Sequence, residues 1–344
     1  MSSKYPMAMV FEPGRIEFEE LEVAEPGPGQ VLIRTKAVSI CGSDLHAFHD
    51  RHPFAPLPAA LGHELSGEVA ETGLKVDKVK PGDRVVLEPV ITCHQCEFCA
   101  RGDYHLCAKI SFHHRQGQGA FTPFFLADQD WVHLLPDNVS FEEGALVEPL
   151  SVAIHALGRA GLKMGQSLAI FGAGAIGLLL LLLARRAGAG EVFVADVKNY
   201  QLKMAGKLGA TAVFDNRAAQ AGEEILVRTK GLGVDAAFEA VGLEATLNQA
   251  LECLKKGGTA VVVGLMSRDR VSLPANLFVA KEITLRGSQG YCRDFQTALT
   301  LLRLGALDLK PLVTHTLPPE KLQKGFELLS RPDSEAIKVV IKYD

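Results

Sequence analysis

The fold is decided by residues 167–184, which read SLAIFGAGAIGLLLLLLA. The apolar run Ser167–Phe171 has the length of a buried strand, and the run Ile176–Ala187 has the length of a helix. Between them stands the pattern G-x-G-x-x-G, as Gly172-Ala173-Gly174-Ala175-Ile176-Gly177. A glycine loop between a strand and a helix is the start of a dinucleotide-binding unit, so this stretch predicts one.

Each glycine of the loop has its own expected role. Gly172 permits a tight turn, Gly174 lets a pyrophosphate approach the backbone, and Gly177 lets the helix pack closely on the strand. The backbone N–H groups at the start of the helix, near Ala175 and Ile176, are expected to receive the phosphates.

A second apolar run, Glu191–Asp196, is predicted to be the next strand, and it ends in a carboxylate. Asp196 is expected to accept hydrogen bonds from the hydroxyls of the adenosine ribose and to repel a 2′-phosphate. NAD is therefore predicted over NADP, although Lys198 stands close by and keeps NADP open as the alternative.

The segment around the glycine loop alternates between strand and helix patterns. The predicted strands are 167–171, 191–196, 212–214, 234–239 and 258–265, and the predicted helices are 151–160, 176–187, 200–208, 221–229 and 247–254. Such alternation is typical of a doubly wound parallel sheet, to which we assign residues 151–289.

The first 150 residues have a different pattern. Short β-patterned runs such as Val31–Val38, Leu65–Ala70 and Arg84–Leu87 are separated by Gly and Pro, which predicts a barrel or sandwich. The chain ends in another β-like run, Ile337–Ile341. We therefore expect the nucleotide domain to be inserted into a β-rich domain made of residues 1–150 and 290–344.

The composition is that of a folded protein. The chain has 344 residues, of which 47% are hydrophobic and 22% charged, and its formal net charge is -4. A disordered chain would be less apolar and more charged, and a nucleic-acid binder is usually basic, so both classes are disfavoured. At about 100 to 200 residues per domain, two domains are expected.

No stretch predicts export or a membrane span. Residues 1–11 lack an apolar core followed by a small-residue cleavage site, so we expect no signal peptide and a cytoplasmic protein. Residues 168–184 are apolar but short for a span, and their three glycines fit a buried strand and helix better. In a reducing cytoplasm, closely spaced cysteines indicate metal ligation rather than disulfides.

Four of the seven cysteines form the pattern C-x2-C-x2-C-x7-C: Cys93, Cys96, Cys99 and Cys107. Four thiolates this close suit a closed tetrahedral zinc site, which could organise a loop that has little core of its own. An iron–sulfur cluster and four free thiols are the competing interpretations. The bacterial ferredoxin pattern has a shorter last spacing and a proline after the last cysteine, whereas Ala108 follows here, so structural zinc is favoured.

Three further segments carry residues of the kinds that bind catalytic zinc. They are Cys41-Gly42-Ser43-Asp44-Leu45-His46, Gly62-His63-Glu64 and Glu148-Pro149. A thiolate, an imidazole and a carboxylate can hold zinc while leaving a fourth position open for substrate. Spacing alone does not join residues so far apart, and each taken singly is more often structural.

Together these motifs resemble the zinc-containing medium-chain alcohol dehydrogenase family, in particular its polyol (sorbitol-like) and threonine dehydrogenase branches. The resemblance extends over essentially the whole chain and includes Pro81-Gly82-Asp83-Arg84-Val85 and Gly257-Gly258. It implies an α/β protein in which a Rossmann doubly wound parallel sheet is inserted into a GroES-like β-rich catalytic domain. It also implies two zinc ions per subunit, one catalytic and one structural, and a nicotinamide cofactor.

The resemblance assigns the metal ligands residue by residue. Cys41 and His63 match catalytic zinc ligands of the family. Glu148 matches the glutamate of the polyol and threonine branches, and Glu64 matches a catalytic carboxylate that binds zinc directly in some relatives only. One of the two glutamates is expected to bind directly, and the other to act through water or when the metal shifts.

Proton transfer is implied in the same way. Ser43 matches the hydroxyl residue that receives the substrate proton, and His46 matches the histidine that passes it to solvent. Both side chains can donate and accept hydrogen bonds, as a relay requires. Asp44 is expected to support the loop that carries Cys41.

The implied reaction is the reversible oxidation of a secondary alcohol of a polyol, sugar or sugar acid to a ketone. Zinc lowers the pKa of the substrate hydroxyl, and a hydride passes to C4 of the nicotinamide. Sorbitol dehydrogenases usually carry Arg where this chain has Gly290, just before Tyr291-Cys292, which favours another polyol or an aldonic acid. Candidates for lining the substrate pocket are Phe112, His113, His114 and Tyr291.

Two alternatives stay open. The enzyme could act on L-threonine, or the chain could be a non-catalytic zinc- and nucleotide-binding protein, which would not need the pair Ser43 and His46. Relatives are dimers or tetramers, so we expect a homo-oligomer that binds a small alcohol, without a nucleic-acid partner or a membrane.

Overall fold

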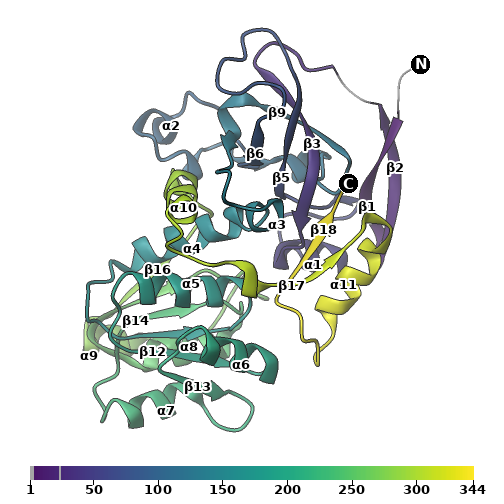
Figure 1. Ribbon diagram of the computed structural model, residues 1–344. Helices are drawn as coiled ribbons and strands as arrows, with labels where there is room; N and C mark the ends of the chain where they lie inside the picture. The colour runs from purple at the N-terminus through teal and green to yellow at the C-terminus, as the bar shows by residue number, and fades with distance from the viewer. Residues whose placement is uncertain (1–3, 23–24) are drawn as a thin grey trace. The chain divides into compact units, whose positions relative to one another are not determined.

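The computed structural model describes residues 4–22 and 25–344. The first three residues of the N-terminal stretch that bears on the cytoplasmic prediction lie outside the described residues, as do residues 23–24. The chain divides into two compact units, one made of Met1–Glu148 with Phe295–Asp344 and the other of Pro149–Asp294 (Figure 1).

The second unit is built on a six-stranded parallel sheet. Its strands are β11 (Leu168–Phe171), β12 (Val192–Asp196), β13 (Ala212–Asp215), β14 (Val234–Glu239), β15 (Leu254–Val262) and β16 (Thr284–Gly287). They lie in the order β13-β12-β11-β14-β15-β16. The order reverses direction between β11 and β14, and doubly wound sheets bind ligands at the carboxyl ends of the strands at such a switch point.

Helices cover this sheet and bury its apolar strands. They are α4 (Val147–Ala160), α5 (Ala175–Arg186), α6 (Asn199–Lys207), α7 (Ala221–Arg228), α8 (Glu244–Glu252) and α9 (Ala275–Lys281). Helix α5 packs on β11 and β12, and α8 packs on β11, β14 and β15 (Figure 1). Leu178–Leu181 are fully buried, so the leucine run belongs to the core. No helix in the described part of the chain has the length and apolarity that a membrane crossing requires.

The predicted elements of this unit are present, but α4 begins at Val147 rather than at 151, α8 begins at Glu244 rather than at 247, and one strand is displaced at both ends. Strand β15 begins at Leu254 rather than at 258 and ends at Val262 rather than at 265. Its pairing with β14 changes register between Val234 and Ala236, and Gly257 has a left-handed φ of 75°. Residues 255–258, Lys-Lys-Gly-Gly, therefore form a local irregularity inside strand β15. Their sequence is typical of a turn, so the prediction started the strand only at Gly258.

The first unit is built on a larger, mostly antiparallel sheet. Its main strands are β3 (Gln30–Ser39), β5 (Glu64–Thr72), β6 (Arg84–Leu87), β9 (Phe124–Asp128), β10 (Val132–Leu134), β17 (Val313–Leu317) and β18 (Lys338–Lys342). The order is β10-β6-β5-β3-β18-β17, with β9 also paired to β3. The C-terminal strand β18 lies beside β3, so the end of the chain rejoins the domain in which the chain began.

Smaller elements complete this unit. Strands β1 (Lys4–Glu12), β2 (Arg15–Glu22) and β4 (Ala59–Ala60) form a second sheet, and β7 (Val90–Ile91) pairs with β8 (Ser111–Phe112). The helices are α1 (Gly42–Phe48), α2 (Glu97–Arg101), α3 (Phe141–Gly144), α10 (Asp294–Arg303) and α11 (Leu322–Ser330). A core cluster that includes Ile33, Leu65, Phe121 and Val339 holds the main sheet in place.

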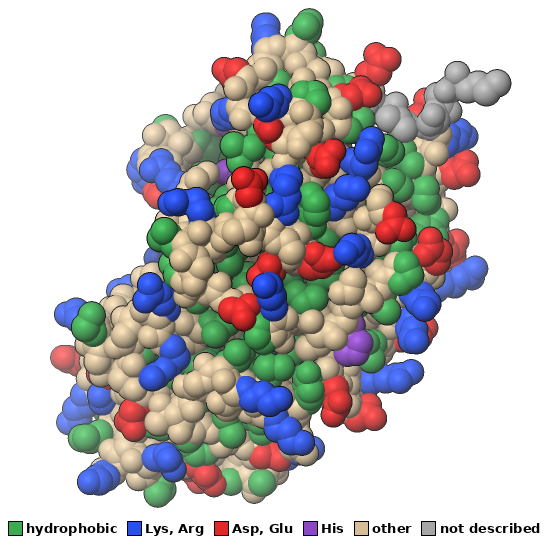
Figure 2. Space-filling model, viewed as in Figure 1, with side chains coloured by type: hydrophobic (Ala, Val, Ile, Leu, Met, Phe, Trp, Pro, Cys, Tyr) green, Lys and Arg blue, Asp and Glu red, His purple; other side chains and the backbone are tan. Residues whose placement is uncertain are grey.

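The face of the molecule drawn in Figure 2 carries charges of both signs. On the face drawn in Figure 2, Lys and Arg side chains alternate with Asp and Glu side chains. An extended nucleic-acid footprint would instead need a patch or stripe of one sign.

Candidate active site and metal centres

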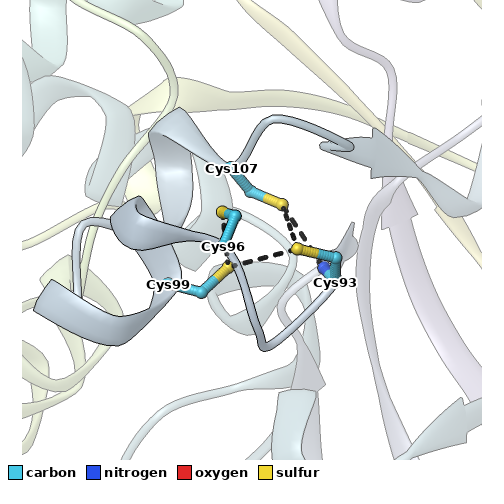
Figure 3. A group of neighbouring side chains, drawn as sticks. All are labelled: Cys93, Cys96, Cys99 and Cys107. Carbon is cyan, nitrogen blue, oxygen red and sulfur yellow. Dashed lines mark hydrogen bonds between the residues drawn. The ribbon is translucent and has the colours of Figure 1, made fainter.

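The four-cysteine loop brings its sulfur atoms together as the spacing predicts (Figure 3). The Sγ atoms of Cys93 and Cys99 are 4.0 Å apart, those of Cys96 and Cys99 3.6 Å, and those of Cys93 and Cys107 3.5 Å. A tetrahedral zinc ion with Zn–S bonds of about 2.3 Å would separate its sulfurs by about 3.8 Å. The four sulfurs therefore fit one zinc ion.

The loop offers little else to hold its shape. Helix α2 within it has no buried residue. Backbone N–H groups instead point at the sulfurs: those of Cys93 and Lys109 donate to Cys107 at 3.3 and 3.4 Å. Backbone N–H groups of Cys99 and Ala108 also lower the pKa of the Cys96 thiol to about 6. These contacts favour the thiolate of Cys96, the form that binds zinc, whereas burial and the neighbouring cysteines raise the pKa of Cys99 to about 12.

The second cluster joins residues that are distant in sequence. Ligand atoms of Cys41, His63 and Glu64 all lie within 4.8 Å of one another. The strand register explains why, because Ser39 at the end of β3 pairs with Glu64 at the start of β5. Cys41 follows β3 and His63 precedes β5, so the pairing brings the two loops side by side.

Asp44 fastens these loops to each other, as expected from its place in the motif. Its carboxylate accepts a hydrogen bond from the N–H of Cys41 at 3.0 Å and another from the N–H of Gly62 at 2.9 Å. It also lies 3.4 Å from Nδ1 of His63. Burial acts to raise the pKa of Asp44, but His63, His114 and the Gly62 N–H together lower it to about 2.

Glu64 has a positive partner that the sequence analysis missed. Lys338, on the C-terminal strand β18, donates to Oε1 of Glu64 at 2.6 Å and to the Ile40 carbonyl at 3.2 Å. Ser39 also donates to the Glu64 carboxylate. Glu64 is 0% and Lys338 2% exposed, so this is a fully buried ion pair. The sequence did contain a signal for this partner. Lys338 lies in the apolar run Ile337–Ile341, and a lysine buried in such a strand is almost always paired with an acidic group.

Glu148 is close to this cluster but outside the group of three. Burial raises the pKa of its carboxyl to about 7, the charge of His63 lowers it, and the nearby charge of Glu64 raises it. A bound cation would favour the ionised form. The structure therefore supplies two buried carboxylates near the cluster. Glu64 forms an ion pair with Lys338, and Glu148 interacts electrostatically with His63 and Glu64.

A cavity adjoins the cluster in the first unit. Its lining includes Ser43, Asp44, His52, His114 and Arg115. His114 also stacks against His63, with ring centroids 4.8 Å apart. Ser43 therefore lines a cavity beside the candidate metal ligands, and His46 lies one turn further along α1.

The other pocket candidates have different surroundings. Phe112 stacks on His114 at 5.7 Å between ring centroids. His113 faces Gln118 at 3.2 Å and packs edge-on against Phe125, so its contacts are those of a packing residue. Tyr291 is buried within the second unit.

The glycine loop of the second unit has the geometry of a phosphate cradle. Gly172 has a φ of 103°, and a Cβ at Gly177 would lie 1.8 Å from the Gly172 carbonyl oxygen. By contrast, a Cβ at Gly174, which caps α5, would meet nothing within 4 Å. The first and last glycines are thus needed for packing, while the middle one leaves open space at a helix N-terminus, next to Ala175 and Ile176.

Asp196 lies at the end of β12 beside this loop. Its carboxylate accepts hydrogen bonds from the N–H groups of Ala173 at 2.6 Å, Val197 at 2.7 Å and Lys198 at 2.8 Å. The side chain therefore also holds the glycine loop against the next strand, a contact that the motif alone did not reveal.

Comparisons with known proteins agree with this geometry. Residues 27–137 match the model of the alcohol dehydrogenase GroES-like domain, and residues 175–303 match that of zinc-binding dehydrogenases. The chain is 38% identical to sorbitol dehydrogenase of Bacillus subtilis over 338 residues, which cover 97% of this chain and 96% of the relative.

Solved structures are similar over the whole chain. One is 2R,3R-butanediol dehydrogenase of B. subtilis, with a TM-score of 0.89, 33% identity and coverage of 99% of this chain and 100% of that one. Another is a zinc-binding dehydrogenase of Sinorhizobium meliloti bound to NADP, with a TM-score of 0.92, 29% identity and the same coverage.

The chain belongs to the zinc-containing medium-chain alcohol dehydrogenase family, in its polyol dehydrogenase branch. It is an oxidoreductase with a GroES-like domain and a Rossmann domain, and it uses zinc and a nicotinamide cofactor to act on a small alcohol.

Proposed function

We propose that this enzyme oxidises a secondary alcohol of a polyol, sugar or sugar acid to a ketone, with NAD as the acceptor. The observation that carries the proposal is the cluster of Cys41, His63 and Glu64, whose ligand atoms lie within 4.8 Å of one another beside a cavity. Cys41, His63 and Glu64 would hold the catalytic zinc directly, and Glu148 would act through water.

Zinc in such a site acts as a Lewis acid that lowers the pKa of a substrate hydroxyl. The chain's own residues then have two tasks. Ser43, which lines the cavity, accepts the hydroxyl proton, and His46 passes it to solvent. Burial, followed by the charges of Arg51 and His49, lowers the pKa of His46, so the neutral imidazole is available as an acceptor at pH 7.

The test is a substrate panel with zinc-loaded protein. Polyols, sugar acids and L-threonine are offered with NAD, and formation of reduced nicotinamide is followed by its absorbance. We expect turnover of a polyhydroxylated substrate and none of threonine. A flat response across the panel, with NAD binding confirmed by titration, would refute the proposal and favour a binding protein.

The cofactor preference has its own test at Asp196. Replacing Asp196 with Ala removes the carboxylate that would bind the ribose hydroxyls and repel a 2′-phosphate. We expect the kcat/KM ratio of NAD to NADP to fall by about tenfold or more. Asp215→Ala, a change at the end of the neighbouring strand β13, is the control. An unchanged ratio in Asp196→Ala would remove Asp196 from this role.

A further inference from the structure

The cavity beside the candidate zinc ligands is bordered by an exposed cation, the guanidinium of Arg115. Arg115 lines it, and its guanidinium lies 4.9 Å from the ring centroid of Phe112 and 5.6 Å from that of Phe54. Among residues 4–22 and 25–344, no carboxylate forms an ion pair with Arg115. The two rings hold the guanidinium in place, and its fork of N–H donors is left for a ligand.

The lining also carries one negative charge, which does not pair with Arg115. Asp44 is the one carboxylate among the lining residues, and its oxygens accept from the N–H groups of Cys41 and Gly62. Burial and the charge of Arg115 lower the pKa of His52 to about 4, so its ring is neutral at pH 7. Arg115 is therefore the one Lys or Arg among the described lining residues, and the ionised Asp44 lies 3.4 Å from His63 and forms no ion pair with Arg115.

Polar groups of another kind line the same cavity. Ser43 contributes a hydroxyl group, and His52 and His114 contribute imidazole rings, whose nitrogens can donate or accept a hydrogen bond. Nδ1 of His114 is buried and has no hydrogen-bond partner among the described residues. Such groups suit the hydroxyls of a polyhydroxylated chain, because each can donate or accept.

We propose that Arg115 forms a subsite for the anionic end of the substrate, so that the enzyme acts on polyhydroxylated anions, either sugar acids or sugar-alcohol phosphates, in preference to neutral polyols. The planar guanidinium matches a carboxylate or phosphate with two parallel hydrogen bonds. This inference rests on the proposed function for its substrate class, since it names which alcohols enter that site. It makes Arg115 a residue that determines specificity.

The experiment compares substrates that differ only in the terminal group. Hexonates (gluconate, galactonate and idonate), the corresponding hexitols, and hexitol 6-phosphates are tested with zinc-loaded protein and NAD. We expect kcat/KM for one of the anionic sets to exceed that of its hexitol by about 10- to 100-fold. A preference for hexonates identifies a carboxylate, and a preference for the phosphates identifies a phosphate. Equal or higher kcat/KM for the hexitols would overturn the proposal.

Variants connect the preference to Arg115. In Arg115→Gln, KM for the anionic substrate should rise by about 10- to 100-fold while kcat/KM for hexitols changes by less than about twofold. Arg115→Lys should recover part of the affinity, because it restores the charge without the planar fork. Arg34→Gln, an exposed arginine of strand β3 in the same unit, is the matched control. An equal loss for anions and hexitols in Arg115→Gln would refute the subsite.

A binding measurement separates this proposal from the proposed function. Calorimetry with gluconate and with hexitol 6-phosphate needs no turnover. If no alcohol is oxidised but an anion binds the wild type and not Arg115→Gln, the subsite stands and the proposed reaction fails. If hexitols are oxidised and neither anion binds more tightly than its hexitol, the reaction stands and the subsite fails.

Discussion

The two metal-ligand clusters of the first unit are organised in opposite ways. Cys93, Cys96, Cys99 and Cys107 lie within one loop whose helix buries no residue, so the chain brings the sulfurs near each other and a metal must hold them. Cys41 follows β3, whereas His63 and Glu64 stand together at the start of β5, and strand pairing, Asp44 and Lys338 hold them before any metal binds. One site is made by spacing along the chain, and the other by the tertiary fold.

This contrast predicts what each cluster loses when one of its ligands is mutated. Loss of a ligand in the four-cysteine loop should damage local structure and leave the chemistry. Loss of a ligand in the other cluster should damage the chemistry and leave the fold, because its ligands are held in place by a core that does not depend on them.

The largest effect should come from Cys41→Ala. We expect kcat to fall by about 10³-fold or more, because Lewis-acid activation contributes several kcal/mol. The melting temperature and the NAD affinity should stay close to those of the wild type. The measurements are steady-state kinetics, a metal count, calorimetry and NAD titration. A variant that lacks one zinc and retains activity would break the comparison.

The second effect tests how the fold prepares the non-local cluster. Lys338→Met leaves the buried Glu64 carboxylate without its ion pair, which should lower the free energy of unfolding by about 3–5 kcal/mol. Urea unfolding after removal of zinc with a chelator measures it, because a zinc ion held by Glu64 would itself compensate the carboxylate. The double variant Lys338→Met/Glu64→Gln should regain a large part of that stability, because it contains no uncompensated charge. Equal stability of the single and double variants would mean that an unpaired Glu64 carboxylate costs little, and would contradict the prediction.

The smallest effect on catalysis should come from Cys96→Ser. The zinc count should fall by one per subunit, and limited proteolysis should cut within residues 93–107, since the loop has no core to hold it. For protein that stays folded, kcat should remain within about threefold of the wild type, because the two clusters share no ligand. A loss of activity as large as that of Cys41→Ala would show that the clusters are coupled.

Much of the architecture follows from local pattern. Residues 167–177 predict a strand, a turn and a helix start, and β11, the glycine loop and α5 lie there. The irregular strand β15 was placed four residues late at its start, because Lys255-Lys256-Gly257-Gly258 reads as a turn when its partner strand is unknown. Neighbouring strands can hold such a segment in a sheet against its own preference.

The two sets of metal ligands could be predicted from the sequence to different degrees. The spacing of the four cysteines points to one site without help. The set of Cys41, His63, Glu64 and Glu148 came from family resemblance, which left open which glutamate binds directly. Neither route found the ion pair of Glu64 with Lys338, whose partners are separated by 274 positions. Nor did either find Arg115 at the edge of the cavity, since nothing in HHRQG distinguishes a ligand-binding arginine from a solvated one.

The sequence by itself determined the glycine cradle and the four-cysteine loop, because each depends on residues within about one turn or loop of each other, where spacing fixes geometry. Only the tertiary structure decided that Cys41 lies with His63 and Glu64, and that Lys338 neutralises this glutamate. Those choices depend on β5, β3 and β18 lying in adjacent positions in one sheet, with β3 between the other two. Side-chain neighbours across strands follow from register, and register is a property of the folded sheet rather than of any one segment.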